Sequence, residues 1–294
     1  MRKLIGGITN FMSLVKFSHT VFAMPFALTG FVYGYAVSGE GIDFWNLLLV
    51  ILAMVFARNA AMGFNRYADR DIDALNSRTR TREIPSGLVS PWSVKLFILF
   101  NALFFIITAA FINRLSFILS FPALALILGY SLVKRFSSMS HYVLGLALAI
   151  APAGAFIAVT GTLNLAAAVL SSVVLLWVSG FDIIYSLADV NFDKKHSLHS
   201  VPQAVGIKNA LRISSAGHMV ILPLLIMFYY AVNSKIELLG LIYMFGALVF
   251  MILLFWQHRI VSSDDLSRVN AAFFTANGIA SLVFAIFTIT DLLI

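Results

Sequence analysis

Cysteine is absent from the 294 residues, and charged residues are scarce, at 11% of the chain. The lack of thiols excludes disulfides, thiolate zinc sites, iron–sulfur clusters and a cysteine nucleophile. Soluble domains carry about a quarter charged residues, so the scarcity of charge excludes a water-soluble globule, a disordered chain and a nucleic-acid-binding domain. With 61% hydrophobic residues and a mean hydropathy of +0.94, the composition indicates an integral membrane protein.

Nine apolar segments have the length that a membrane-spanning helix needs, about 20 residues. The sequence therefore predicts an all-α bundle of nine transmembrane helices, which forms a single domain over residues 1–294. No compact apolar run followed by a small-residue cleavage site marks the N-terminus, so the first span is predicted to be retained. The predicted spans are 17–37, 44–64, 96–113, 115–133, 142–163, 165–181, 213–232, 238–256 and 269–290.

Lys and Arg residues are distributed unevenly between the two sides of the predicted bundle. With the N-terminus placed inside, all 20 of them except Arg114 and Lys235 fall on the inner side. Basic loops of membrane proteins face the cytoplasm, so the pattern predicts a cytoplasmic N-terminus. A pI of about 9.7 fits contact with an anionic cytoplasmic leaflet. Because no long targeting extension precedes the first span, a bacterial inner membrane is the expected location.

The first acidic cluster follows the second predicted span. Asn65, Asp69 and Asp73 are spaced four residues apart, which places their side chains on one face of a helix. Like charges at this spacing repel each other, so a positive group is expected between them.

The second acidic cluster follows the sixth predicted span. Asp182, Tyr185, Asp189 and Asp193 recur at intervals of three or four residues, again on one helical face. Both clusters lie on the predicted inner side of the membrane, so they are expected to open toward the cytoplasm.

Carboxylate and amide oxygens are the ligands that Mg²⁺ prefers, and water and substrate phosphates usually complete its coordination. Asn65, Asp69, Asp73, Asp189 and Asp193 are therefore predicted to hold two Mg²⁺ ions that bind one diphosphate. The alternative is that these carboxylates are solvated helix ends in salt bridges. That alternative is disfavoured because charge at membrane depth is costly without a partner.

Cations and a phenol beside the clusters are candidates for contacts with phosphate oxygens. Arg66 and Lys194 carry the charge that such contacts require. Tyr130 and Lys134, four residues apart near the inner end of the fourth span, share a helical face. Contact with anionic lipid is the alternative for each of these cations.

These motifs resemble those of the UbiA family of intramembrane prenyltransferases. Residues 65–85 are similar to the first aspartate-rich signature of the family and residues 182–193 to the second, while Tyr130 and Lys134 match its Tyr-x-x-x-Lys motif. The flanking stretches 16–27 and 264–270 are most similar to enzymes of quinone pathways. Those enzymes are the 4-hydroxybenzoate polyprenyltransferases and the menaquinone prenyltransferases of the futalosine route.

The resemblance implies transfer of a polyprenyl group from polyprenyl diphosphate to an aromatic acid, with apolar walls that keep water from an allylic carbocation. The acceptor is open between 4-hydroxybenzoate and a dihydroxynaphthoate, because Lys16 stands near the place where 4-hydroxybenzoate enzymes usually carry an arginine. The residues implied in catalysis are Asp69, Asp73, Asp189 and Asp193. The residues implied in substrate binding are Lys16, His19, Arg66, Tyr130, Lys134, Asp182, Tyr185 and Lys194.

Three other functions fit parts of this pattern. A CDP-alcohol phosphotransferase is also a magnesium-dependent membrane enzyme, but the dense Asp-x-x-Asp-Gly-x-x-Ala-Arg signature of that family is absent from the sequence. Other UbiA branches, such as haem O synthase, share the catalytic motifs, and only the flanking segments disfavour them. A membrane cation transporter would carry its acidic residues near the bilayer midplane, whereas these residues lie at inner helix ends beside arginines.

Overall fold

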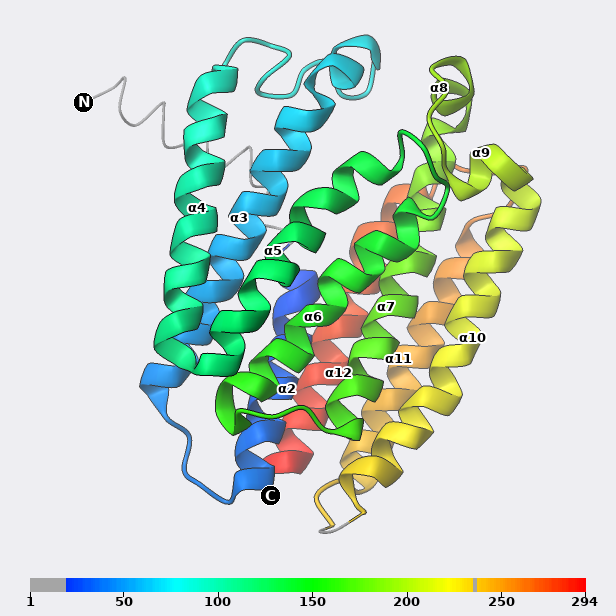
Figure 1. The fold of residues 1–294 in the computed structure, drawn as a ribbon. Coiled ribbons are helices and arrows are strands. Elements are labelled where there is room, and N and C mark those ends of the chain that lie inside the picture. The colour runs from blue at the N-terminus through cyan, green and yellow to red at the C-terminus, as the bar shows by residue number, and fades with distance from the viewer. Residues whose placement is uncertain (1–19, 235–236) are drawn as a thin grey trace. The chain divides into compact units, whose positions relative to one another are not determined.

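The computed structural model describes residues 20–234 and 237–294, and helices are the only regular secondary structure in these ranges. The prediction of an all-α protein is therefore confirmed, and Figure 1 shows the helices joined by mostly short loops. The elements are α2 (Thr20–Ser38), α3 (Phe44–Leu75), α4 (Pro91–Ile112), α5 (Arg114–Val133), α6 (Ser140–Thr160), α7 (Leu165–Ser186), η2 (Leu187–Asp189), α8 (Val190–Lys195), α9 (Val201–Val205), α10 (Ile207–Val232), α11 (Leu241–Ile260), η3 (Ala271–Ala276) and α12 (Asn277–Leu293).

Eight helices in the described part of the chain are long and apolar enough to cross a membrane. A shorter apolar helix covers Phe22–Ser38, within the first predicted span. The chain is thus a multi-pass integral membrane protein, while the number of nine spans stays a prediction. The second predicted span is longer than expected, because α3 continues beyond residue 64 and carries the first acidic cluster on the same helix.

Local sequence signals explain where several helices begin and end. Ser90 precedes α4, and its hydroxyl accepts a hydrogen bond from the backbone N–H of Ser93. Asn164 caps α7 in the same way through Ala167. Such caps satisfy N–H groups that have no partner within the helix. At the other end of α6, Gly161 adopts a left-handed conformation with φ of 65°, which glycine accepts without steric cost.

The chain divides into two compact units, and each is described by itself. Among the described residues, unit 1 comprises Thr20 and Leu48–Leu132. In it, the Asn59 side chain of α3 donates a hydrogen bond to Asn101 of α4 at 3.0 Å. A hydrogen bond between helices stabilises packing in lipid, where apolar contact alone gives no preference for protein over lipid.

The loop after α3 folds back onto the helices of unit 1. Its residues Ile84 and Val89 form a buried apolar cluster with Val94, against which Tyr67 and Phe97 pack. This anchoring holds the intervening polar residues of the loop near the end of α3, where the first acidic cluster lies.

Unit 2 comprises Val21–Leu47 and Val133–Ile294, and α7 packs against both α6 and α10. Glycines allow these close approaches. A Cβ atom on Gly145 of α6 would lie 2.5 Å from the backbone oxygen of Leu175, and one on Gly180 of α7 would lie 2.1 Å from Nε2 of His218. Small residues at such positions are typical of helix packing in membranes.

The ring of His218 joins α7, α10 and α11 through hydrogen bonds. Its Nε2 lies 3.1 Å from the backbone oxygen of Trp177, which can only accept, so Nε2 carries the proton. The other nitrogen, Nδ1, then accepts from His258 Nε2 at 2.9 Å and from Gln257 at 3.0 Å. These partners satisfy a histidine that is buried within unit 2.

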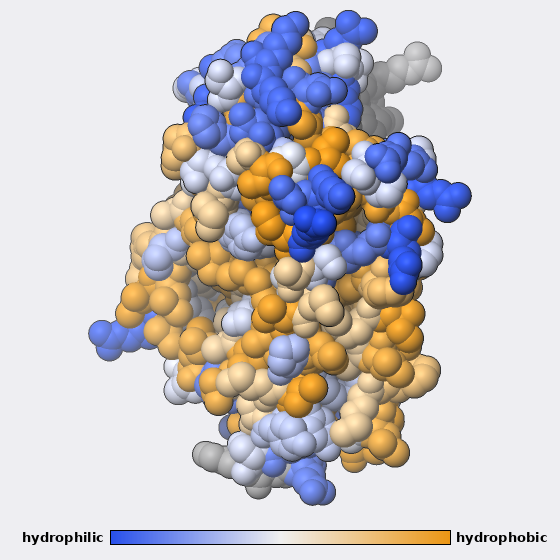
Figure 2. All heavy atoms as spheres, turned by 90° about the vertical axis from the view of Figure 1, so that its right-hand side faces the viewer, coloured by the Kyte–Doolittle hydropathy of each residue, from blue (hydrophilic) through white to orange (hydrophobic). Residues whose placement is uncertain are grey.

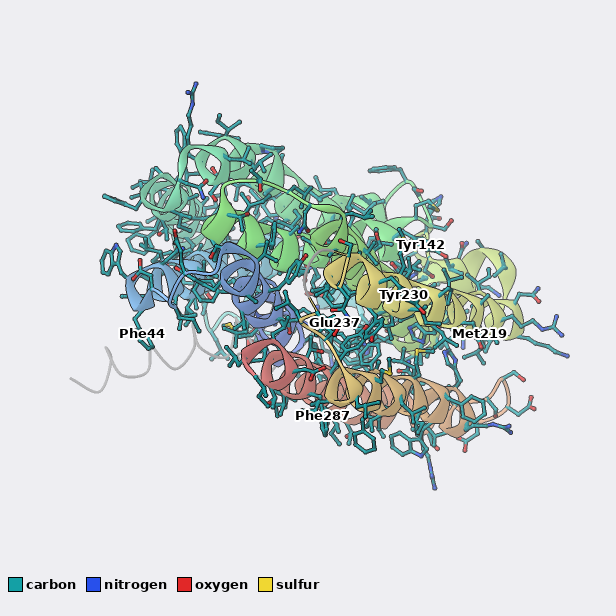
Figure 3. All side chains as sticks on the ribbon, turned by 90° about the horizontal axis from the view of Figure 1, so that it is seen from below. Phe44, Tyr142, Met219, Tyr230, Glu237 and Phe287 are labelled. Carbon is teal, nitrogen blue, oxygen red and sulfur yellow. The ribbon has the colours of Figure 1, made fainter. Side chains whose placement is uncertain are left out.

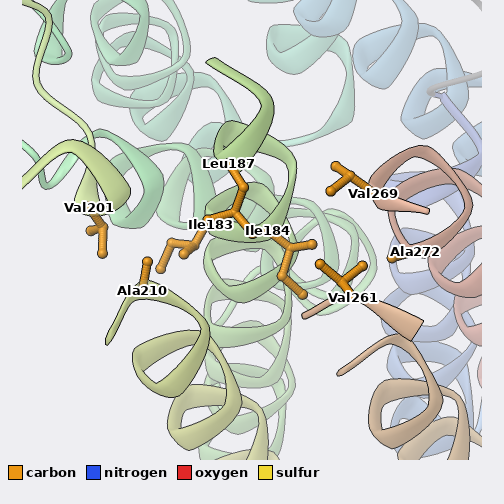
Figure 4. Close-up of a cluster of buried hydrophobic side chains, with 8 residues drawn as sticks. All are labelled: Ile183, Ile184, Leu187, Val201, Ala210, Val261, Val269 and Ala272. Carbon is orange, nitrogen blue, oxygen red and sulfur yellow. The ribbon is translucent and has the colours of Figure 1, made fainter. Parts of the chain in front are cut away.

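A buried apolar cluster anchors the end of α7 that leads to the second acidic cluster. Ile183, Ile184 and Leu187 pack there with side chains from α9, α10, η3 and the segment between α11 and η3, as Figure 4 shows. The full set of buried members is Ile183, Ile184, Leu187, Val201, Ala210, Val261, Val269 and Ala272.

Apolar side chains also cover the outside of the long helices. Met219 and Tyr230 of α10 are largely exposed, and Figure 3 labels both along that helix. Figure 2 shows a broad hydrophobic band on the face that includes α10, with hydrophilic residues toward its two ends. This pattern is expected of helices whose surface meets lipid tails.

Candidate functional site

The first acidic cluster occupies one face of the last turns of α3 in unit 1. Asp69 and Asp73 are only 2% and 4% exposed, which is unusual for carboxylates. The amide nitrogen of Asn65 donates to Asp69 at 3.3 Å and to the Ser131 hydroxyl of α5 at 3.3 Å. Because the NH₂ group is used in this way, the carbonyl oxygen of Asn65 is its remaining ligand atom.

Asp73 forms an ion pair with Arg82, a partner that the sequence did not identify. Nη1 of Arg82 lies 2.7 and 2.8 Å from the two carboxylate oxygens of Asp73, and the Thr79 hydroxyl donates to the Asp73 backbone oxygen. The loop after α3 thus supplies the positive group that was expected beside the aspartates. A metal ion at Asp73 would have to share this carboxylate with Arg82.

Two arginines of α3 place charge inside unit 1. Arg66 is 4% exposed, and its Nε atom is buried without a hydrogen-bond partner among the described residues. Nε and Nη2 of Arg58 are also buried without a hydrogen-bond partner among the described residues. Tyr130 of α5 interacts electrostatically with both guanidinium groups, and Glu83 does so with Arg66. Buried guanidinium nitrogens without partners suit an anionic ligand.

Arg58 is a further candidate for the site, although from the sequence it was counted only among the residues that set orientation. It lies seven residues, or about two turns, before Asn65 on the same helix. A signal was present in the sequence. Arg58 stands inside the second predicted span, and a charged residue within a span is a functional candidate by default.

The second acidic cluster in unit 2 lies on three consecutive helical segments rather than on one regular helix. Asp182 and Tyr185 belong to the end of α7, Asp189 ends the 3₁₀ turn η2, and Asp193 belongs to α8. A 3₁₀ turn is tighter than an α-turn and rotates the residues that follow it. A single regular stripe was therefore wrong in detail, although the four residues remain close along the chain.

Two carboxylates of this cluster have neutral hydrogen-bond donors. Nδ1 of His141 lies 2.7 Å from Asp182. Its Nε2 accepts from the Val201 backbone N–H at 3.3 Å, so the proton is on Nδ1 and His141 donates. The Ser200 hydroxyl donates to Asp193 at 2.8 Å. The segment between α8 and α9 therefore helps to orient the cluster.

The other predicted site residues are placed as follows. Lys134 follows α5 within unit 2, where it interacts electrostatically with Asp193 and its backbone oxygen accepts from the His199 N–H at 2.7 Å. Lys194 is exposed on α8. Lys16 and His19 lie outside the described residues.

Within the part of the chain that the structure describes, three or more His, Cys, Asp or Glu side chains nowhere form a group that could hold a metal ion. Each acidic cluster on its own thus offers an incomplete set of oxygen ligands. This set fits a hard cation that takes its remaining ligands from water and from a phosphorylated substrate.

The fold and these clusters define a multi-pass helical membrane protein with acidic, oxygen-rich sites at helix ends. Residues 23–279 match the UbiA prenyltransferase family, and the chain belongs to that family. The predicted class, a membrane prenyltransferase, is therefore confirmed, whereas a CDP-alcohol phosphotransferase and a cation transporter are not supported.

Relatives with curated functions extend over most of the chain. A 4-hydroxybenzoate octaprenyltransferase of Nitrosospira multiformis is 31% identical over 258 residues, which are 86% of each chain. The enzyme of the same name from Aeromonas hydrophila is 29% identical and covers 83% of each chain.

Solved structures share the fold. A UbiA homolog from Aeropyrum pernix, determined in the apo form, superposes with a TM-score of 0.78 at 28% identity and covers 94% of this chain and 97% of its own. A UbiA homolog from Archaeoglobus fulgidus bound to GPP and Mg²⁺ has a TM-score of 0.73 at 20% identity, with coverage of 97% and 100%.

Proposed function

We propose that this enzyme transfers a polyprenyl group from polyprenyl diphosphate to a carboxylated aromatic acceptor, with 4-hydroxybenzoate as the first candidate. The observation that carries the proposal is the burial of two carboxylates, Asp69 and Asp73, on the same helix of unit 1 as a buried arginine, Arg66. The names of the curated relatives support 4-hydroxybenzoate and hence ubiquinone synthesis. The flanking sequence around Lys16 keeps dihydroxynaphthoate and menaquinone synthesis as the alternative.

Two Mg²⁺ ions are proposed as cofactors. The ligands would be Asn65, Asp69 and Asp73 in unit 1, and Asp189 and Asp193 in unit 2. The metal would neutralise charge on the diphosphate as it leaves. That both sets serve one diphosphate is a prediction from the sequence, and the proposal of an oxygen-bound cation rests on the ligand types of this chain.

The diphosphate contacts are proposed to come from both units. Arg66 is already desolvated within unit 1. It can therefore donate a strong charge-assisted hydrogen bond to an anion without much further loss of its own hydration. Tyr130, beside Arg66, can donate its phenolic proton to a phosphate oxygen. Lys134 and Lys194 would add positive charge from unit 2, and Asp182 would orient the segment that carries Tyr185.

The acceptor carboxylate is proposed to bind Arg58. This arginine lies deeper along α3 than Arg66, away from the end of the helix, and two of its nitrogens are buried without partners among described residues. A planar guanidinium recognises a carboxylate through two parallel hydrogen bonds. Lys16 and His19 remain proposed acceptor contacts.

The chemistry that follows needs few proton transfers by the protein. The C–O bond of the prenyl diphosphate breaks, and its electron pair leaves with the diphosphate. The allylic carbon then forms a C–C bond with the acceptor ring, and the ring proton passes to the departed diphosphate, so that the ring becomes aromatic again. Apolar side chains exclude the water that would otherwise convert the carbocation into an alcohol.

An assay in membranes tests the proposed function. Membranes that contain the enzyme, incubated with polyprenyl diphosphate, Mg²⁺ and either 4-hydroxybenzoate or a dihydroxynaphthoate, are expected to form one prenylated product that mass spectrometry identifies. Removal of divalent cations by EDTA should stop its formation, and added Mg²⁺ should restore it. Absence of product with both acceptors, or full activity in EDTA, would contradict the proposal.

Replacement of Arg58 tests the acceptor site. Arg58→Leu is expected to raise the KM for the aromatic acid by about tenfold or more, the loss of a charge-assisted contact, with a smaller change in the KM for prenyl diphosphate. Arg114→Leu, which removes an exposed arginine of unit 1, is the control. An acceptor without a carboxyl group should be used equally poorly by the wild type and by Arg58→Leu. Equal KM values for the acid in both enzymes would refute the assignment.

We further propose that the enzyme forms one domain over residues 1–294 in a bacterial inner membrane, with the N-terminus and both acidic clusters on the cytoplasmic side. The distribution of Lys and Arg along the sequence supports this orientation.

A further inference from the structure

A polar pair lies in the middle of the aromatic core of unit 2. Trp177 of α7 and Asn277 of α12 are both fully buried, and the indole N–H donates to the Asn277 side-chain oxygen at 2.8 Å. A buried polar pair of this kind has a strict geometry, because each unmade hydrogen bond is costly.

Asn277 uses its second polar atom to stabilise an unusual turn. Its NH₂ group donates to the backbone oxygens of Ala272 and Phe273, both at 3.0 Å. These oxygens belong to η3, a π-helical segment that spans Ala271–Ala276. π-helical turns are rare, appear mostly as single turns inside α-helices and are frequent at functional sites.

The side chain placed by this π-turn is that of Phe273. Its ring stacks on Tyr185 with centroids 4.2 Å apart and planes inclined by 29°, and it contacts Phe181 and Phe22 edge to face. Phe273 is buried, whereas Tyr185 is half-buried. Tyr185 thus lies between the buried ring of Phe273 and the exposed ring of Phe274, which it contacts edge to face.

If Asp189 holds the diphosphate, as proposed, the prenyl chain would begin near Tyr185. Tyr185 is four residues before Asp189 in a run of helical segments that includes the 3₁₀ turn η2, on the side that leads back into the apolar part of α7. A diphosphate held at Asp189 would therefore extend its first isoprene unit toward this ring. An aromatic face attracts a cation and excludes water.

We propose that Phe273 and Asn277 are positioning residues, which hold the ring of Tyr185 against the first isoprene unit of the prenyl diphosphate. The proposal rests on the proposed function and specifies the substrate group that this part of the site recognises. The hydrogen bonds of Asn277 stabilise the π-helical turn, and this turn positions the side chain of Phe273. The ring of Phe273 in turn fixes the plane of the Tyr185 ring.

The test compares the products of Phe273→Leu with those of a matched control. Phe273→Leu removes the ring beneath Tyr185 and keeps an apolar residue. The control, Phe284→Leu, makes the same change at a buried position of α12 where the ring packs against Phe26 and Phe250. Each enzyme receives polyprenyl diphosphate, Mg²⁺ and acceptor, and both the prenylated product and the free prenyl alcohol are quantified per folded enzyme.

Phe273→Leu is expected to raise the KM for polyprenyl diphosphate and the ratio of alcohol to prenylated product by about two- to tenfold, the range for loss of an aromatic pair. The KM for the acceptor should change less. Phe273→Tyr keeps the ring, so its KM for polyprenyl diphosphate and its alcohol ratio should equal those of the wild type. Phe284→Leu should also match the wild type. Asn277→Ala should raise the same KM and the same alcohol ratio as Phe273→Leu does. If Asn277→Ala does not fold, Trp177→Phe is used in its place and should raise both quantities.

Two results would overturn this assignment. Phe273→Leu could show the same KM and alcohol ratio as Phe284→Leu, or Phe273→Tyr could fail to restore them. A failure of the proposed function would be seen differently, because the wild type itself would then form no prenylated product.

Discussion

Loss of Asp69 or of Asp189 is expected to abolish prenyl transfer, a reduction of roughly a thousandfold or more, as for removal of a group that stabilises charge in the transition state. Asp69→Ala removes a buried carboxylate of α3, and Asp189→Ala removes the carboxylate that ends η2. Turnover is measured in membranes and normalised to the amount of inserted protein. Membrane insertion should not change, because neither residue lies in the apolar part of a span.

The same helix offers a matched control for Asp69. Asp71 is exposed and pairs with Arg70 at 3.3 Å, so Asp71→Ala should retain most of the wild-type turnover. Normal turnover by Asp69→Ala or Asp189→Ala would refute the assignment of metal ligands.

Gly145→Ala is expected to lower the stability of unit 2. The added Cβ would lie 2.3 Å from the Ser179 hydroxyl and 2.5 Å from the backbone oxygen of Leu175, so α6 and α7 would have to separate. Overpacking of this kind costs about 1–3 kcal/mol, occasionally more. Thermal unfolding in detergent should show a lower midpoint, together with reduced activity, because α7 carries Asp182 and Tyr185.

Gly154 of α6 provides the comparison for this change. The nearest atom to a Cβ at Gly154 would be Cγ2 of Ile150, at 3.9 Å, an ordinary contact. Gly154→Ala should therefore unfold at the wild-type temperature or above it, since alanine favours helix more than glycine does. Equal stability of the two variants would show that α6 and α7 approach less closely at Gly145 than described.

The sequence was sufficient to predict the helices and the acidic clusters because both depend on local patterns. A run of apolar residues defines a span, and a spacing of four residues places Asn65, Asp69 and Asp73 on one side of α3 whatever surrounds it. The ends of the spans were predicted less well. A helix that carries polar residues beyond the membrane, as α3 does up to Leu75, is not limited by hydropathy.

Contacts between distant residues could not be predicted from one sequence. His141 and Asp182 are 41 positions apart, and Arg82 reaches Asp73 only because the loop between them folds back. Nor does hydrophobic periodicity separate core from surface here. Exposed Leu241 and buried Leu254 belong to the same helix, and both lipid and core accept apolar side chains.

The π-helical turn at Ala271–Ala276 has a consequence for any exchange of the last helix with another protein. Such a turn arises when one residue is inserted into an α-helix, and each residue of an α-helix turns the chain by about 100°. An alignment with a relative whose helix is uninterrupted must therefore contain a one-residue gap between Ala271 and Ala276. A graft made without this gap would direct the side chain of Phe273 to a different side of the helix.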